Sequence, residues 1–89
     1  MVLKVKMLDV NGRLLEIRIR SNRRIAVREA DLPTPPPKTV TLRCMGEQLE
    51  MRLVIQQFGY AVYYMPANAF RRLAELAGMY ETLPCVFTF

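Results

Sequence analysis

The sequence predicts a small, mainly β domain of six to seven antiparallel strands, folded as a β-sandwich or a barrel, with one C-terminal α-helix and a final strand. Three observations predict this class. Apolar and polar residues alternate over most of the first 65 positions, as they do in half-buried strands. Short Gly-, Asn- and Ser-containing turns divide this pattern, and one later stretch changes to helical spacing. The 89 residues are enough for one domain.

The first turn, around an Asn-Gly pair, decides which way the first two strands face. A two-residue loop would set Val10 opposite Arg13 and mix apolar and charged side chains on both faces. A three-residue loop that includes Val10 sets Asp9 opposite Arg13 and puts Gly12 in the left-handed region. This second loop gathers all the aliphatic residues on one face. Because exposing each of several aliphatic side chains costs about 1.5–3 kcal/mol, we predict the three-residue loop.

A similar loop over residues 21–23 adds a third strand, so residues 1–29 are predicted to form a three-stranded meander. Its outer face collects basic residues, and some of them lie directly opposite one another even though like charges across a strand pair are mildly destabilising. A surface that binds phosphates or carboxylates would have this property. The six candidate binding residues are Lys4, Lys6, Arg18, Arg20, Arg23 and Arg24.

Residues 30–38 contain four prolines in five positions and are predicted to form a stiff connector. Residues 39–65 then form a second three-stranded meander. Taking Gly46-Glu47 as a two-residue loop with glycine first sets Cys44 opposite Leu49 and Arg43 opposite Glu50. The core-facing side of this meander therefore includes Cys44.

The turn at residues 58–59 fixes the last strand of the second meander. It sets Val62 opposite Ile55 and Tyr64 opposite Leu53. We therefore expect Tyr64 to point into the core and Tyr63 to point toward the helix.

Residues 66–78 are predicted to be the helix, with Pro66 in its first turn and Gly78 at its end. Its apolar stripe is expected to cover the outer side of the second meander. The stripe comprises Phe70, Leu73, Leu76 and Ala77, and the residues beneath it Val54, Tyr63 and Met65.

The chain ends in a predicted strand over residues 83–89, with Cys85, Phe87 and Phe89 on one face. Cys44 and Cys85 then both face the core. They are candidates for a disulfide, the alternative being two reduced core thiols.

The composition favours a binding protein over an enzyme. Ten of the thirteen basic residues are arginine, and with eight acids the net charge is +5. Arginine presents a permanently charged planar fork that suits phosphate or carboxylate. The chain has no histidine, no glycine-rich phosphate loop and no paired acids, so we expect no catalytic residues, no metal site and no cofactor.

The predicted partner is nucleic acid, bound through its backbone phosphates by the six basic residues, or else an acidic protein surface. The rival hypothesis is a protein-assembly module that forms a homodimer through the C-terminal strand, using either the edge of residues 83–89 or their Phe-rich end. The opening residues alternate in polarity, which predicts no membrane segment and a cytoplasmic protein. The single serine and few amide residues are typical of a heat-adapted protein.

Two stretches also suggest a family. "VKMLDVNGRLLEIRIRS", and later "YAVYY" followed by "RRL", resemble the opening and closing stretches of the small β-barrel subunit of archaeal and eukaryotic RNA polymerase, the RpoG type. The likeness covers about a third of the chain. Where that family would show Gly-Gly-Leu after the aromatic strand, this chain continues with residues 65–68, Met-Pro-Ala-Asn. The resemblance implies a small subunit of a larger complex.

Overall fold

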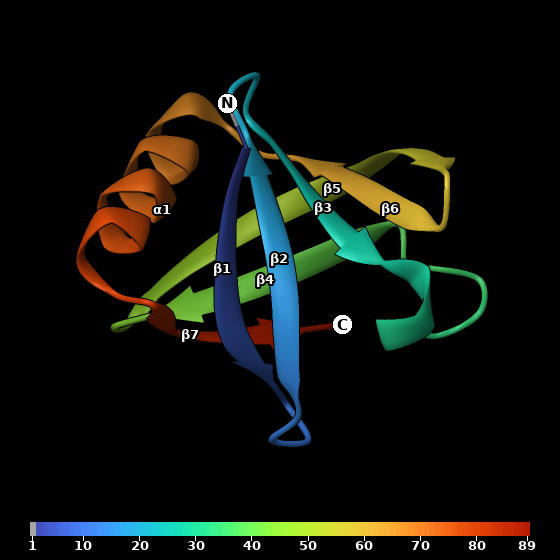
Figure 1. Cartoon of the computed structure of the whole chain (residues 1–89), viewed down its shortest axis with the longest axis horizontal. Coiled ribbons are helices and arrows are strands. Elements are labelled where there is room, and N and C mark those ends of the chain that lie inside the picture. The colour runs from blue at the N-terminus through green and yellow to red at the C-terminus, as the bar shows by residue number, and fades with distance from the viewer. Residues whose placement is uncertain (1) are drawn as a thin grey trace.

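The computed structural model, which describes residues 2–89, is a closed barrel of seven strands with one α-helix (Figure 1). The order around the barrel is β1-β2-β3-β6-β5-β4-β7, and β7 returns to lie parallel to β1. The predicted mainly β fold with one C-terminal helix and a final strand is confirmed, and of its two forms the barrel is the one observed. The strands are not all antiparallel as predicted, because β7 runs parallel to β1. The elements are β1 (Val2–Asp9), β2 (Leu14–Arg20), β3 (Arg24–Arg28), a short 3-10 turn (Glu29–Asp31), β4 (Thr39–Cys44), β5 (Glu47–Gln57), β6 (Tyr60–Tyr64), α1 (Ala67–Met79) and β7 (Thr82–Thr88).

The first turn has the predicted three-residue loop. The Asp9 amide donates a hydrogen bond to the Arg13 carbonyl at 2.9 Å, and Gly12 has a φ of 80°. The Asp9 carboxylate also accepts hydrogen bonds from the backbone amides of Asn11 and Arg13, each at 2.8 Å. The aliphatic residues of β1 and β2 therefore share the core face, and the register of the whole β1–β2–β3 meander is as predicted.

The turn between β4 and β5 differs from the prediction by one residue. Its loop is Met45-Gly46, both at positive φ, and Cys44 pairs with Glu47 instead of Leu49. This is the conformation of a type I′ hairpin, which matches the right-handed twist of strands. The shift moves each partner by two positions, so the core-facing residues stay inside. Arg43 now lies opposite Gln48, and its predicted pairing with Glu50 is wrong.

A β-bulge in β5 changes the register with β6. Ile55 pairs with Val62 as predicted, but the ladder shifts between Leu53 and Ile55, and Leu53 pairs with Tyr63. The prediction that Tyr64 enters the core is therefore wrong. Tyr63 is fully buried, while Tyr64 lies half-buried on the outer face.

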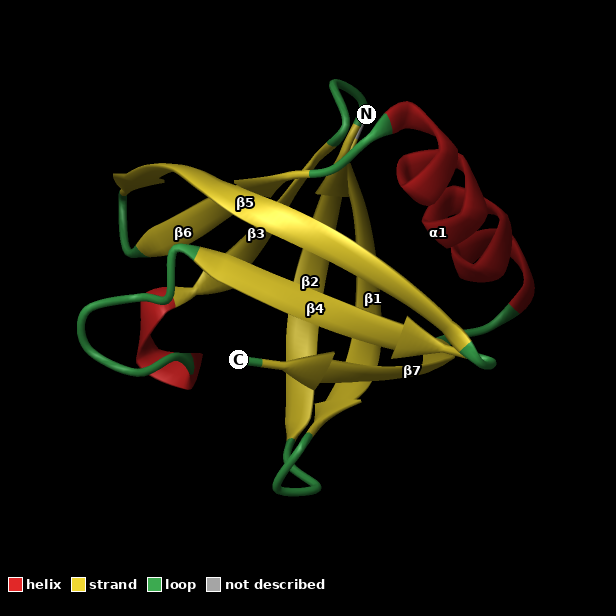
Figure 2. Ribbon diagram, turned by 180° about the vertical axis from the view of Figure 1, so that it is seen from behind, coloured by secondary structure: helices red, strands yellow, loops and turns green. Residues whose placement is uncertain are grey.

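Helix α1 lies beside the barrel, and its buried residues Ala69, Leu73 and Leu76 join the same core cluster as the strands (Figures 1 and 2). Pro66 is its N-cap, and Gly78 lies inside the helix, which continues to Met79. The helix does not cover the predicted outer residues. Tyr63 and Met65 point into the core and Val54 is 46% exposed.

Strand β7 closes the barrel between β4 and β1. Cys44 and Cys85 are register partners in β4 and β7, with their Cα atoms 4.2 Å apart, and they form the predicted disulfide. β7 pairs with β4 on one side and with β1 on the other. Both edges of β7 are therefore paired within the barrel, which leaves no free β7 edge for a second copy to pair with.

One buried hydrogen bond ties the proline-rich connector to the barrel wall. The hydroxyl of Tyr63 donates to the carbonyl of Pro37 at 2.7 Å. Burial raises the pKa of Tyr63 to about 12. The inward orientation of Tyr63, which the sequence did not predict, thus places a buried polar group where a backbone acceptor satisfies it.

Candidate nucleic-acid interface

The outer side of β2, β3, β6 and β5 carries a group of arginine and tyrosine side chains, which we call the Arg–Tyr face. Strand pairing sets Arg20, Arg24, Tyr64 and Arg52 side by side in one row across the four strands. Neighbouring strands are about 4.8 Å apart, so this row packs three cations and one ring closely together. The face comprises Arg18, Arg20, Arg23, Arg24, Arg52, Tyr60 and Tyr64.

The six predicted binding residues fall into two groups. Arg18, Arg20 and Arg24 lie on the outer side of β2 and β3, and Arg23 occupies the turn between these strands. Lys4 and Lys6 lie on β1, where they pair with Arg18 and Glu16. The structure thus brings the four arginines together with the tyrosines and leaves the two lysines at the border of the face.

The cations of the Arg–Tyr face have no acidic partners among residues 2–89. The salt bridges of this part of the chain involve Arg13, Arg28 and Arg72, with acids at 3.3–3.8 Å. Arg13 and Arg72 lie away from the Arg–Tyr face, whereas Arg28 lies at its border on β3, opposite Tyr60, and pairs with Asp31. The arginines assigned to the Arg–Tyr face thus form no salt bridge among residues 2–89, although the carboxylates of Glu16 and Glu50 lie on the same outer side, on β2 and β5.

The arginines instead pack on the tyrosine rings. The guanidinium carbon of Arg18 lies 4.9 Å from the centre of the Tyr60 ring, and that of Arg23 lies 4.9 Å from the centre of the Tyr64 ring. Arg24 approaches Tyr64 at 5.9 Å. These are cation–π distances, and the contacts hold the guanidinium groups in place without consuming their charge.

The packing of Arg18 on Tyr60 leaves one polar atom of Arg18 without a hydrogen-bond partner. Its Nε is buried, and no hydrogen-bond acceptor reaches it from residues 2–89. Buried polar atoms without a partner are uncommon in folded proteins and call for a reason. An anion bound on the outer side would supply charge complementarity that the protein itself does not provide to Arg18.

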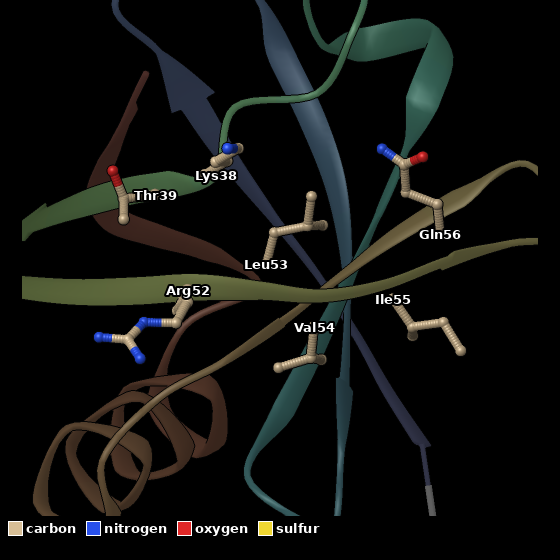
Figure 3. A pocket seen from close by; sticks show the side chains of 7 residues that line it. All are labelled: Lys38, Thr39, Arg52, Leu53, Val54, Ile55 and Gln56. Carbon is tan, nitrogen blue, oxygen red and sulfur yellow. The ribbon is translucent and has the colours of Figure 1, made fainter.

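The β5 bulge adds an apolar component beside the arginines. Figure 3 shows Leu53 and Gln56 on one side of β5, and on the other side Arg52, Val54 and Ile55. An unbroken strand would turn consecutive residues to opposite faces, but the bulge keeps two aliphatic neighbours outside together.

Val54 and Ile55 form what we call the aliphatic strip, and they are 46% and 45% exposed. The hollow of about 660 Å³ that they help to line also includes Arg52. The outward-facing Ala26 and Val62 are buried even though they lie on the outside of the barrel, so larger side chains cover the middle of the sheet. The face is therefore a mixture of cationic, aromatic and aliphatic groups.

Sequence reasoning missed three members of this face: Arg52, Tyr60 and Tyr64. The signal that could have found the tyrosines is the pairing of β6 with β3. Because Ile25 faces the core, its partner Tyr63 must do so too, and Tyr64 must face outward.

Residues 2–89 contain no group of three or more Cys, Asp or Glu side chains placed to hold a metal ion. Within the same range, no helix has the length and apolar character needed to cross a membrane. Comparison with known proteins found no matching family model, no matching curated protein and no matching solved structure.

Proposed function

We propose that this protein is a non-catalytic module that binds nucleic acid through the Arg–Tyr face, mainly by contacts with backbone phosphates. The observation that carries the proposal is the row Arg20–Arg24–Tyr64–Arg52, in which three cations lie together without an acidic partner among residues 2–89. Fixed arginines suit phosphate because the guanidinium fork can donate two parallel hydrogen bonds to its oxygens.

Salt dependence gives the proposal a quantitative form. If about five phosphates are engaged, the slope of log affinity against log salt concentration is about −3.5 to −4.5. Affinity should then fall about 100- to 500-fold between about 50 and 200 mM salt. This strong dependence distinguishes ionic contacts with phosphate from apolar binding.

The experiment measures fluorescence anisotropy of labelled DNA and RNA oligonucleotides at both salt concentrations. Two variants carry the same change of charge. Arg18→Glu/Arg20→Glu alters the Arg–Tyr face, while Arg43→Glu/Arg71→Glu alters exposed arginines on β4 and α1. We expect the first to lose at least about 50-fold in affinity and the second only a few-fold, since about two phosphate contacts are removed in the first case alone.

Circular dichroism confirms that each variant is folded, and Arg20→Gln/Arg52→Gln provides a milder second test. Absence of binding at low salt, or equal losses in the two double variants, would overturn the proposal. Polyglutamate serves as a competitor. If it displaces the oligonucleotide at equal charge concentration, the face selects anions in general, and an acidic protein surface becomes the better assignment of its partner.

A further inference from the structure

We infer that the nucleic acid bound by the Arg–Tyr face is single-stranded, with its bases against the tyrosines and the aliphatic strip and its phosphates against the arginines. This inference rests on the proposed function and assigns the class of its ligand. It depends on the outward orientation of Tyr64, which is opposite to the orientation expected from the sequence.

The row across the sheet places an aromatic ring between cations. In the row across the sheet, Tyr64 lies between Arg24 and Arg52, one strand away from each. A ligand that alternates flat apolar groups with anionic groups fits such a row. A single strand has this composition, because its bases are free to turn toward the protein while its phosphates stay within reach of the arginines.

The two Arg–Tyr pairs provide surfaces on which bases could stack. Arg18 lies over Tyr60 and Arg23 over Tyr64, each at 4.9 Å. Bases stack on aromatic rings and equally on the planes of arginine guanidinium groups. The two Arg–Tyr pairs thus present planar groups that are already held in position, so little side-chain freedom is lost when a base binds.

The exposed aliphatic strip favours a single strand over a duplex. A duplex keeps its bases inside and presents phosphates and sugars, so its binding would set Val54 and Ile55, each nearly half exposed, against the most polar part of the ligand. A single strand can bury these side chains under a base. The free energy of apolar burial therefore adds to the affinity for a single strand and not to that for a duplex.

The shape of the barrel wall also favours a single strand. The molecule measures 31 × 28 × 20 Å, and the Arg–Tyr face lies on the outer wall of its closed barrel. The outer wall of a barrel is convex, and a duplex is itself a convex cylinder that bends only at considerable cost. Two such surfaces meet along a narrow line. A flexible single strand can follow the curvature from β2 across to β5 and meet all the arginines of the row.

The test compares three probes of equal length, about 15 nucleotides: a single strand, the same strand in a duplex, and a strand of abasic sites that keeps the phosphates without the bases. We expect the single strand to bind at least about 10-fold more tightly than either of the other two. Tyr64→Ser and Ile55→Ser keep every charge, and Leu14→Ser, at an aliphatic residue of β2 that is 56% exposed, is the control.

Tyr64→Ser should weaken single-strand binding by about 5- to 150-fold, the usual range for losing one stacked base. Binding of the abasic strand should weaken by a smaller factor, because that strand loses only the ordering of Arg23 and Arg24 by the Tyr64 ring. Ile55→Ser should act in the same direction and Leu14→Ser should have no effect. Equal affinity of the wild-type protein for the single strand and the abasic strand would overturn the inference while leaving phosphate binding intact. Failure of all three probes to bind would instead overturn the proposed function. The comparison of probes needs no variant, so it decides the question even if Tyr64→Ser does not fold.

Discussion

Breaking the Cys44–Cys85 disulfide should remove a large part of the stability of the barrel. The two cysteines are 41 positions apart, and the loop that they close contains the whole of β5, β6 and α1. In the chain-entropy treatment, a loop of this length contributes about 4 kcal/mol by restricting the unfolded chain. A domain of 89 residues is typically stable by about 4–13 kcal/mol in total. The disulfide would thus supply between about a third and nearly all of the free energy of unfolding.

The location of the bond strengthens this expectation. β7 is the strand that closes the barrel, and the disulfide joins it covalently to β4 at the Cys44–Cys85 register pair. For a domain of this size, a loss of about 4 kcal/mol corresponds to a fall in Tm of about 15–30 °C.

The assay compares thermal unfolding of the oxidised protein with that of protein unfolded and refolded in the presence of a reductant. Prior unfolding is needed because Cys44 is fully buried and Cys85 is only 4% exposed, so a reductant reaches the bond poorly in the native state. The variant Cys44→Ala/Cys85→Ala is the control for the reductant itself, and its Tm should be the same under both conditions. If oxidised and reduced wild-type protein unfold within about 5 °C of each other, the entropic account of the bond is refuted.

Four further predictions concern three positions. Gly12→Ala should destabilise the protein by about 1 kcal/mol in chemical denaturation, because Gly12 has a φ of 80° and a Cβ there meets no atom of residues 2–89 within 4 Å, which leaves backbone strain as the whole effect. Tyr63→Phe should cost about 1–2 kcal/mol by leaving the carbonyl of Pro37 unpaired. The stability of the wild-type protein should also fall between pH 10 and 12, since unfolded tyrosine ionises near 10 while Tyr63 keeps its proton in the fold up to about 12, and denaturation curves of Tyr63→Phe should lack this part of the fall. Arg52→Gln should reduce the salt slope of oligonucleotide binding by about 0.7–0.9, and an unchanged slope would remove Arg52 from the interface.

The cationic part of the site was predictable because hairpin loops fix it. In the β1–β2 hairpin, Met7 and Leu15 must both be buried, and only the loop that includes Val10 allows this. Once that loop is chosen, Lys4 and Arg18 have to lie opposite each other on the outside. The energy of burying several aliphatic side chains exceeds any preference of one turn type over another, so alternation in the sequence was sufficient.

The predicted loop between β4 and β5 was wrong by one residue, since it is Met45-Gly46 and not Gly46-Glu47, and this had little consequence. Glycine occurs in both of the two-residue hairpin turns, first in type II′ and second in type I′, so Gly46 alone does not choose between them. The two choices differ by two positions in register, which conserves the face of every side chain. Arg43 consequently changed its partner from Glu50 to Gln48 but remained outside.

The aromatic part of the site was not predictable from alternation, because the sequence Leu53-Val54-Ile55 has no alternation to interpret. Three aliphatic residues in succession are equally compatible with a regular strand and with a bulge, and local propensity does not distinguish the two. What decides the matter is closure of the barrel. β6 has to pair with β3 on one edge and with β5 on the other, and the β3 edge requires Tyr63 inside. One extra residue in β5 reconciles the two edges, and the same residue leaves Val54 and Ile55 together on the outside. A requirement of the core thus creates the apolar component of the face, and this component is what favours a single strand over a duplex.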